Sequence, residues 1–224
     1  MISCCKKILI PILLAVSTFS CNKSNTDNEP DPEHIYYKGW GANSLEDPEG
    51  TKFTLPDGIE FMEALHFSTS EDDSCFAKDW SSSNATGNGS LVTLCVSFYN
   101  KTNKPIRLEL PPGLIFISRL KTAQNGILAE RASYEVPAGK VDYHQFNLQC
   151  MNSGRDPSSH AGNYDLGPVT NVQAAIDLFK FIENKDLYKD PLLGAYVQGA
   201  VHDIGDEGKV SEFVWEHLRQ LPNK

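Results

Sequence analysis

Several residues of this sequence carry side chains that could do chemistry, and one group lies close together near the C-terminus. His202, Asp203, Asp206 and Glu207 surround Gly205, and oxygen ligands crowded near a glycine-rich turn could hold Ca²⁺. Their spacing does not match an EF-hand loop, which needs acids at alternate positions and a glutamate at the twelfth. We therefore interpret the group as a solvated turn whose acids are favoured near the N-terminus of the next helix.

Cys150 is the candidate nucleophile of the sequence, because His144 precedes it and His160 follows it. A neighbouring histidine is the base that activates a cysteine thiol in many enzymes. His144 lies on the same face of the predicted strand, about 20 Å away at roughly 3.3 Å per residue, and cannot pair with the thiol. His160 could return through the following loop, but its surroundings resemble no thiol-enzyme motif. We therefore expect Cys150 to be a buried structural thiol and assign no catalytic residue.

The segment from Met151 to Tyr164 is long, polar and rich in glycine and serine. Loops of this length are often functional, so Arg155, His160 and Tyr164 are the candidates for ligand contact. The alternative is a plain connection between strands and helices.

Tryptophan side chains could also stack on sugar rings, but ordinary packing is the favoured interpretation for Trp40, Trp80 and Trp215. The chain has no G-x-S-x-G, H-E-x-x-H, P-loop or G-x-G-x-x-G motif, and no C-x-x-C pair. We predict no cofactor and no metal site.

The N-terminus has the pattern of an export signal. Lys6 and Lys7 precede an apolar run over residues 8–16, and small or polar residues then lead to Cys21. The run is much shorter than the roughly 20 residues that span a bilayer. A cysteine after a small residue at this place resembles the lipobox of bacterial lipoproteins. Thr18 departs from the leucine or valine usual there, and such looser boxes resemble those of Bacteroidota.

This resemblance implies that residues 1–20 are removed as a signal peptide and that Cys21 receives the lipid. The alternative is an ordinary secreted protein cut nearby. Residues 22–33 contain no large apolar side chain and two prolines, so they should form a disordered tether. We expect the mature protein in the cell envelope, anchored to the outer membrane through this lipid.

Composition and cysteine count narrow the possible partners. The chain has 224 residues, a formal net charge of −9 and 40% hydrophobic residues. This acidic balance disfavours nucleic acid, since phosphate contacts need clustered lysine and arginine. After lipidation of Cys21, the cysteines beyond the signal are Cys75, Cys95 and Cys150, an odd number that allows one disulfide in an oxidising compartment. We favour Cys75 with Cys95.

The segment 34–168 is predicted to be strand-rich. Residues 91–99, 105–110, 114–117 and 143–150 are β-branched, aromatic or alternating, and turn signals recur roughly every 8–12 residues, as in antiparallel sandwiches. Further short strands are expected over 52–55, 59–67, 127–130 and 134–136. The order of strand, N-K-T turn, strand and P-P-G turn resembles Ig-like or transthyretin-like domains of exported bacterial proteins, without implying functional residues.

The segment 169–224 changes to a helical period. Apolar stripes predict helices over about 172–182, 192–204 and 210–221. Strands followed by helices indicate an α+β protein, here a β-sandwich-like domain with a helical segment packed on it.

These features predict a lipid-anchored envelope protein with a non-enzymatic binding or assembly role, for a protein or glycan partner. The alternative class is a hydrolase of envelope or dietary polymers with a site built from loops.

The anchor makes a direct prediction. Mass spectrometry of the membrane fraction should show an acylated peptide that begins at Cys21, and the Cys21→Ala variant should leave the membrane because its only lipid attachment is gone. An unmodified N-terminus at another residue would contradict the assignment.

Overall fold

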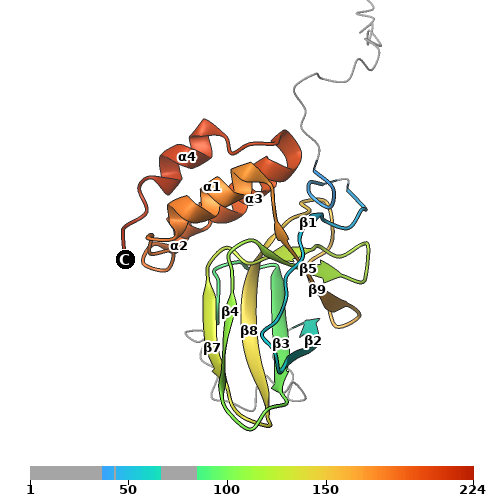
Figure 1. Cartoon of the computed structure of the whole chain (residues 1–224). Coiled ribbons are helices and arrows are strands. Elements are labelled where there is room, and N and C mark those ends of the chain that lie inside the picture. The colour runs from blue at the N-terminus through green and yellow to red at the C-terminus, as the bar shows by residue number, and fades with distance from the viewer. Residues whose placement is uncertain (1–36, 43, 67–84) are drawn as a thin grey trace, which may run out of the picture. The chain divides into compact units, whose positions relative to one another are not determined.

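A computed structural model describes residues 37–42, 44–66 and 85–224, all within the compact unit 33–224 (Figure 1). These ranges hold nine strands and four helices, with the helices gathered at one end of the strands. The strands are β1 (Gly50–Thr51), β2 (Ile59–His66), β3 (Val92–Asn100), β4 (Ile106–Leu110), β5 (Leu114–Ser118), β6 (Gly126–Ile127), β7 (Ala132–Val136), β8 (Val141–Cys150) and β9 (Asn163–Thr170). The helices are α1 (Gln173–Ile182), α2 (Pro191–Gly194), α3 (Tyr196–Glu207) and α4 (Glu212–Leu218).

Six strands close into an antiparallel barrel in the order β9-β2-β3-β8-β6-β5, and β5 returns to β9. β1 pairs with the C-terminal end of β9, whereas β2 pairs with its N-terminal end. The longest ladders join β3 to β2 and to β8, where every second residue of β3 points into the barrel. Closure leaves few free strand edges, which is how barrels avoid unwanted pairing with other chains.

The remaining two strands, β4 and β7, form a separate antiparallel pair. Leu108, Leu110 and Val136 from this pair are fully buried in the same core as the barrel interior. The pair therefore covers the barrel and shares its apolar core.

The closed barrel corrects the sandwich expected from the sequence, and β9 is the reason. Residues 151–168 were predicted to be a loop, whereas Asn163 onwards forms the closing strand. Gly167 and Pro168 interrupt the strand pattern, but they lie where the β5–β9 register shifts, since Phe116 pairs with Leu166 and Leu114 with Val169. Proline and glycine are tolerated at such a bulge.

Most other predicted strands are confirmed, with shifted ends. β2, β3, β4, β5 and β8 match the predicted ranges closely. The strand expected over 52–55 is absent, and the chain pairs instead at Gly50–Thr51. The strand expected over 127–130 is reduced to β6, because the chain turns there toward the β4–β7 pair.

Helices are confirmed in all three predicted ranges, but the one predicted over about 192–204 is divided at Ala195 into the short α2 and the longer α3. Asp190 caps α2 by accepting from the backbone N–H groups of Leu192 and Leu193, and Pro191 holds its first position. Gly208, with φ of 77°, ends α3, and Ser211 caps α4. None of the helices in the described ranges is long and apolar enough to cross a membrane.

Helices and barrel meet through strand residues that alternate between two cores. Phe116 and Leu128 belong to the core inside the barrel, whereas Ile115 and Ile127 belong to the core under the helices. The helical core also includes Leu178, Val201, Ile204 and Leu218, all fully buried. The two cores therefore share one wall.

Truncating this wall should destabilise the whole fold. Phe116→Ala removes a ring that is 0% exposed, so we expect a loss of about 3–5 kcal/mol in the free energy of unfolding. Urea unfolding of the full chain, followed by circular dichroism, measures it. Leu192→Ala, at a side chain that is 78% exposed, is the matched control and should change stability by less than about 0.5 kcal/mol. Equal effects of the two substitutions would contradict the two-core description.

Candidate ligand pocket

A pocket of about 490 Å³ lies where the barrel meets the helical segment. Three segments far apart in the sequence form it: the loop 87–90, strand β8 at Asn147, and residues 187–198 around α2. We call it the neutral pocket, because none of its lining residues is an acid, a base, a histidine or a cysteine. Its lining residues are Gly87, Asn88, Gly89, Ser90, Asn147, Leu187, Tyr188, Pro191, Ala195 and Gln198.

The loop side of the pocket is fixed by main-chain bonds to β8. The Thr86 N–H donates to Gln145 O over 3.0 Å, and the Gly89 N–H donates to Asn147 O over 2.9 Å. A Cβ on Gly89 would lie 1.9 Å from Leu148 O. Only glycine allows the loop to lie this close to the strand.

Asn88 joins the loop to the helical side. Its Nδ2 donates to Gly194 O over 2.9 Å, and its Oδ1 accepts from Gln149 Nε2 over 2.6 Å. Each carboxamide has two N–H groups and two oxygen lone pairs. One N–H and one lone pair of Asn88 therefore remain beyond the bonds that the structure describes.

Gln198 makes the corresponding link from α3 to the end of β8. Its Oε1 accepts from the Cys150 N–H over 2.7 Å, and its Nε2 donates to Cys150 O over 2.9 Å. This pair of bonds imitates a strand partner and fixes the carboxamide plane. Here too the described bonds leave one donor and one acceptor.

Tyr188 supplies the aromatic part of the lining and is 53% exposed. Its hydroxyl donates to Glu130 Oε2 over 2.8 Å, and Lys224 Nζ binds the other oxygen of the same carboxylate at 3.2 Å. Burial and the neighbouring Glu130 raise the pKa of the Tyr188 hydroxyl, so it stays protonated at neutral pH. The ring is held in place by its own hydroxyl.

The three candidates for ligand contact lie away from this pocket. Arg155 donates to the main-chain oxygens of Ala123 and Ser44 and so supports loop structure. Tyr164 is 1% exposed and donates to Gln124 O over 3.1 Å, and burial raises its pKa to about 12. His160 is exposed and packs edge-on against His66, with ring centroids 4.9 Å apart.

His66 also contacts a serine, and a histidine beside a serine is the base–nucleophile pair of many hydrolases. Its Nδ1 lies 2.8 Å from Ser158 Oγ. However, Ser158 is buried and its Oγ accepts the Thr93 N–H over 3.1 Å. A hydroxyl enclosed by main-chain groups cannot reach a substrate carbonyl. The contact therefore positions the loop after β8.

The acidic group near the C-terminus lies within the last two turns of α3, which corrects its interpretation as a turn between helices, and its acids tie segments together. Asp203 accepts the Ser211 N–H over 2.9 Å, and Asp206 accepts from the Ala42 N–H over 2.8 Å and from Ser153 Oγ over 3.1 Å. Burial lowers the pKa of His202 more than these two acids raise it. Within the described ranges, no three potential ligands gather as a metal site would require. A second acidic run of the sequence, Glu71, Asp72 and Asp73, which we interpret as a solvated loop, lies outside those ranges.

The tryptophans that the structure describes serve packing. Trp40 is buried in the helical core, and Trp215 packs edge-on against Phe181 with ring centroids 5.1 Å apart. Trp80 lies outside the described residues.

Cys95 is disulfide-bonded and Cys150 is a free, buried thiol. Because Cys75 lies outside the described residues, its pairing with Cys95 stays a prediction, as does the lipid on Cys21. Burial raises the pKa of the Cys150 thiol to about 12.

Sequence reasoning missed the neutral pocket because amides, glycines and one tyrosine carry no catalytic or metal signature. The closest signal is the run of residues 81–90, whose glycines, serines and asparagines and lack of large apolar side chains are typical of a loop but indicate no role. Comparisons with protein-family models, with curated proteins and with solved structures found no match to this chain. The fold and the pocket therefore describe this protein by its geometry and not by a family: it is a closed β-barrel with a helical cap and a neutral pocket at their junction.

The state of Cys150 is testable. In the native full chain, iodoacetamide should leave the Cys150 peptide unmodified, because the reactive thiolate is rare at neutral pH and the sulfur is 0% exposed. Peptide mass mapping after treatment in guanidinium should show complete alkylation of the same peptide. Native alkylation at a rate near that of a free cysteine would contradict a buried thiol.

Proposed function

We propose that this protein is a lipid-anchored, non-enzymatic binding component of a bacterial cell envelope and that the neutral pocket is its ligand site. The observation that carries the proposal is the lining of the pocket: apolar walls with a few fixed amide groups and no charged side chain. Binding sites for small molecules have this composition, in a volume of roughly 300–1,000 Å³.

The same lining argues against catalysis at this place. General acid–base chemistry needs groups whose pKa lies near the working pH. The one ionisable lining residue, Tyr188, has a raised pKa and a hydroxyl already bound to Glu130. The hydrolase alternative would need a base and a nucleophile in one pocket. Ser90 supplies a hydroxyl, but no lining residue of the neutral pocket is a histidine, an acid or a lysine that could activate it.

The anchor belongs to the proposal through the sequence. The lipobox-like site at Cys21 and the polar residues 22–33 would place the folded unit beside the outer membrane on a tether. Electrostatic docking on anionic lipid is disfavoured by the net charge of −9. The lipid would then be the membrane contact, and the pocket would face a protein or glycan partner in the envelope.

A blocked pocket tests the proposal. Ala195 is exposed and lines the pocket, so Ala195→Trp should fill it without disturbing a core. The measurement is saturation-transfer NMR with a panel of oligosaccharides, short peptides and aromatic fragments. We expect at least one class of compound to bind the full chain and to lose this binding in Ala195→Trp. The bound compound should not be chemically converted during long incubation.

Val141→Trp is the matched control, because Val141 is exposed and pairs with Tyr99 at the other end of the barrel. Binding that survives Ala195→Trp, or conversion of a panel member, would contradict the proposal.

A further inference from the structure

We infer that the ligand of the neutral pocket is an uncharged, polyhydroxylated molecule, namely a neutral glycan. This inference rests on the proposed function and adds the chemical class. It follows from three properties of the pocket: the absence of charge in its described lining, the kind of hydrogen-bonding groups it presents, and the fixed tyrosine ring at its wall.

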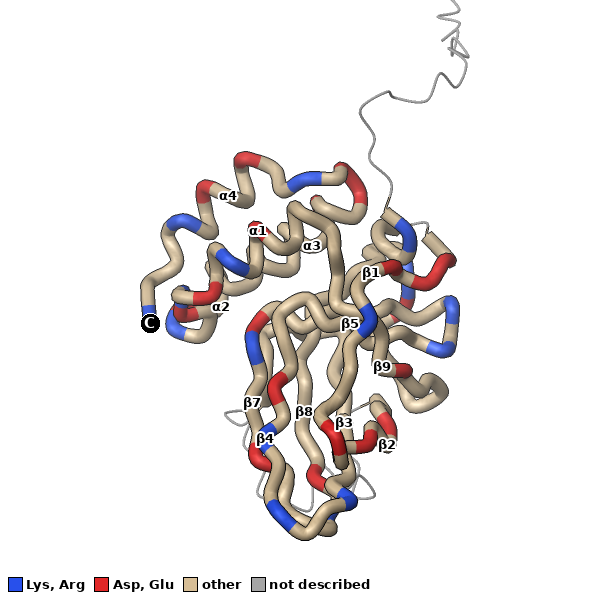
Figure 2. The backbone as a smooth tube through the Cα atoms, viewed as in Figure 1, with Lys and Arg blue, Asp and Glu red and all other residues tan. Residues whose placement is uncertain are grey.

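Charge is the first property. Acidic and basic residues are interspersed along both the strands and the helices (Figure 2). Other hollows of the described surface include them: one is lined by Glu49 and Lys52, and another by Arg131, Lys180 and Glu183. A ligand with a phosphate, carboxylate or ammonium group would need an opposite charge or a helix end. No charged side chain lines the neutral pocket. Pro191 and Ala195 lie at the starts of α2 and α3, but the Asp190 carboxylate already accepts from the Leu192 and Leu193 N–H groups, and the Ala195 N–H donates to Pro191 O. The pocket therefore favours an uncharged ligand.

Hydrogen-bonding character is the second property. Asn88 and Gln198 each keep one N–H and one lone pair beyond their described bonds, and Ser90 and Asn147 add further donors and acceptors. A sugar hydroxyl both donates and accepts, so it can satisfy such mixed groups. A purely apolar ligand would bury them without partners, which costs free energy.

The aromatic wall is the third property. The Tyr188 ring is half-exposed and oriented by the bond to Glu130, and Leu187 and Pro191 lie beside it. A sugar ring has apolar C–H groups on its faces and hydroxyls at its rim. An aromatic surface with amides around it matches both parts, since aromatic rings supply apolar contact with little loss of conformational entropy.

An extended peptide fits this place less well, although its main chain is also uncharged. Peptides commonly bind by adding a strand to a free sheet edge. Beside the pocket, the edge of β8 is already paired, because Asn147 N–H donates to Thr86 O over 2.8 Å and Asn147 O accepts from Gly89 N–H. A peptide would have to bind by side chains alone.

The test is isothermal titration of the full chain with neutral oligosaccharides of glucose, mannose, galactose and xylose, beside their sulfated and sialylated counterparts. We expect a neutral oligosaccharide to bind, and Tyr188→Ala to weaken it about tenfold or more, as for an aromatic residue at the centre of a contact. Tyr188→Phe keeps the ring but removes the hydroxyl that orients it through Glu130, so it should weaken binding less than Tyr188→Ala does.

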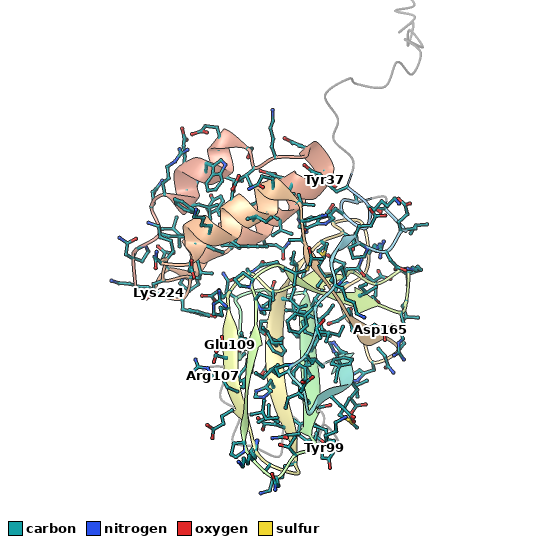
Figure 3. All side chains as sticks on the ribbon, viewed as in Figure 1. Tyr37, Tyr99, Arg107, Glu109, Asp165 and Lys224 are labelled. Atoms are coloured by element: carbon teal, nitrogen blue, oxygen red, sulfur yellow. The ribbon has the colours of Figure 1, made fainter. Side chains whose placement is uncertain are left out.

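Tyr99→Ala is the control for loss of a tyrosine, because Tyr99 lies at the end of the barrel away from the helices (Figure 3). It should bind as the unmodified chain does. Two outcomes would overturn the glycan inference and leave the binding proposal standing. In the first, only the charged counterparts bind; in the second, only peptides or aromatic fragments bind. In both, Ala195→Trp abolishes the binding. If no probe of any class binds in a manner that Ala195→Trp abolishes, both fall.

Discussion

The alternation of side chains along β5 and its neighbours is the constraint on which this structure depends. Successive residues face opposite sides of a strand, so Phe116 fills the barrel while Ile115 packs under the helices. Cys150 and Met151 divide in the same way. One wall thus belongs to two cores, and the helices could not be removed without exposing fully buried apolar residues of the barrel wall. The helical segment is therefore part of the fold and not an appendage.

The neutral pocket is a consequence of this shared wall. Where β8 ends, Cys150 still packs in the barrel core and the next residue, Met151, enters the helical core. The main-chain N–H and C=O of Cys150 require partners there, because buried polar groups are costly when unpaired. Gln198 provides both partners from α3. That link brings α2 and Tyr188 beside the loop 87–90, which Asn88 then ties to Gly194. The space enclosed between them is the pocket.

The sequence was informative where one physical rule acts alone. β3 and β8 follow a period of two, and α1, α3 and α4 follow the helical period, so these elements could be predicted. β9 was missed because Gly167 and Pro168 are rare within strands, and only the pairing with β5 shows that they form a bulge. Arg155 and Tyr164 were recognised as unusual polar residues of the 151–168 segment, yet their partners are main-chain oxygens far away in the sequence. No local pattern encodes such partners.

The pocket could not be predicted for a further reason, which also bears on how it would work. Its amides come from segments about 50 and 100 residues apart, and each is held by bonds that exist without a ligand. A site fixed in this way loses little side-chain entropy on binding, and preorganisation of this kind is what allows a few polar contacts to give useful affinity. Without charge, the pocket also has no strong electrostatic attraction to offer. Its selectivity must then come from the directions in which Asn88, Gln198 and the Tyr188 ring are held. A poorly matched ligand would also bury the remaining N–H groups and oxygen lone pairs of these amides without partners.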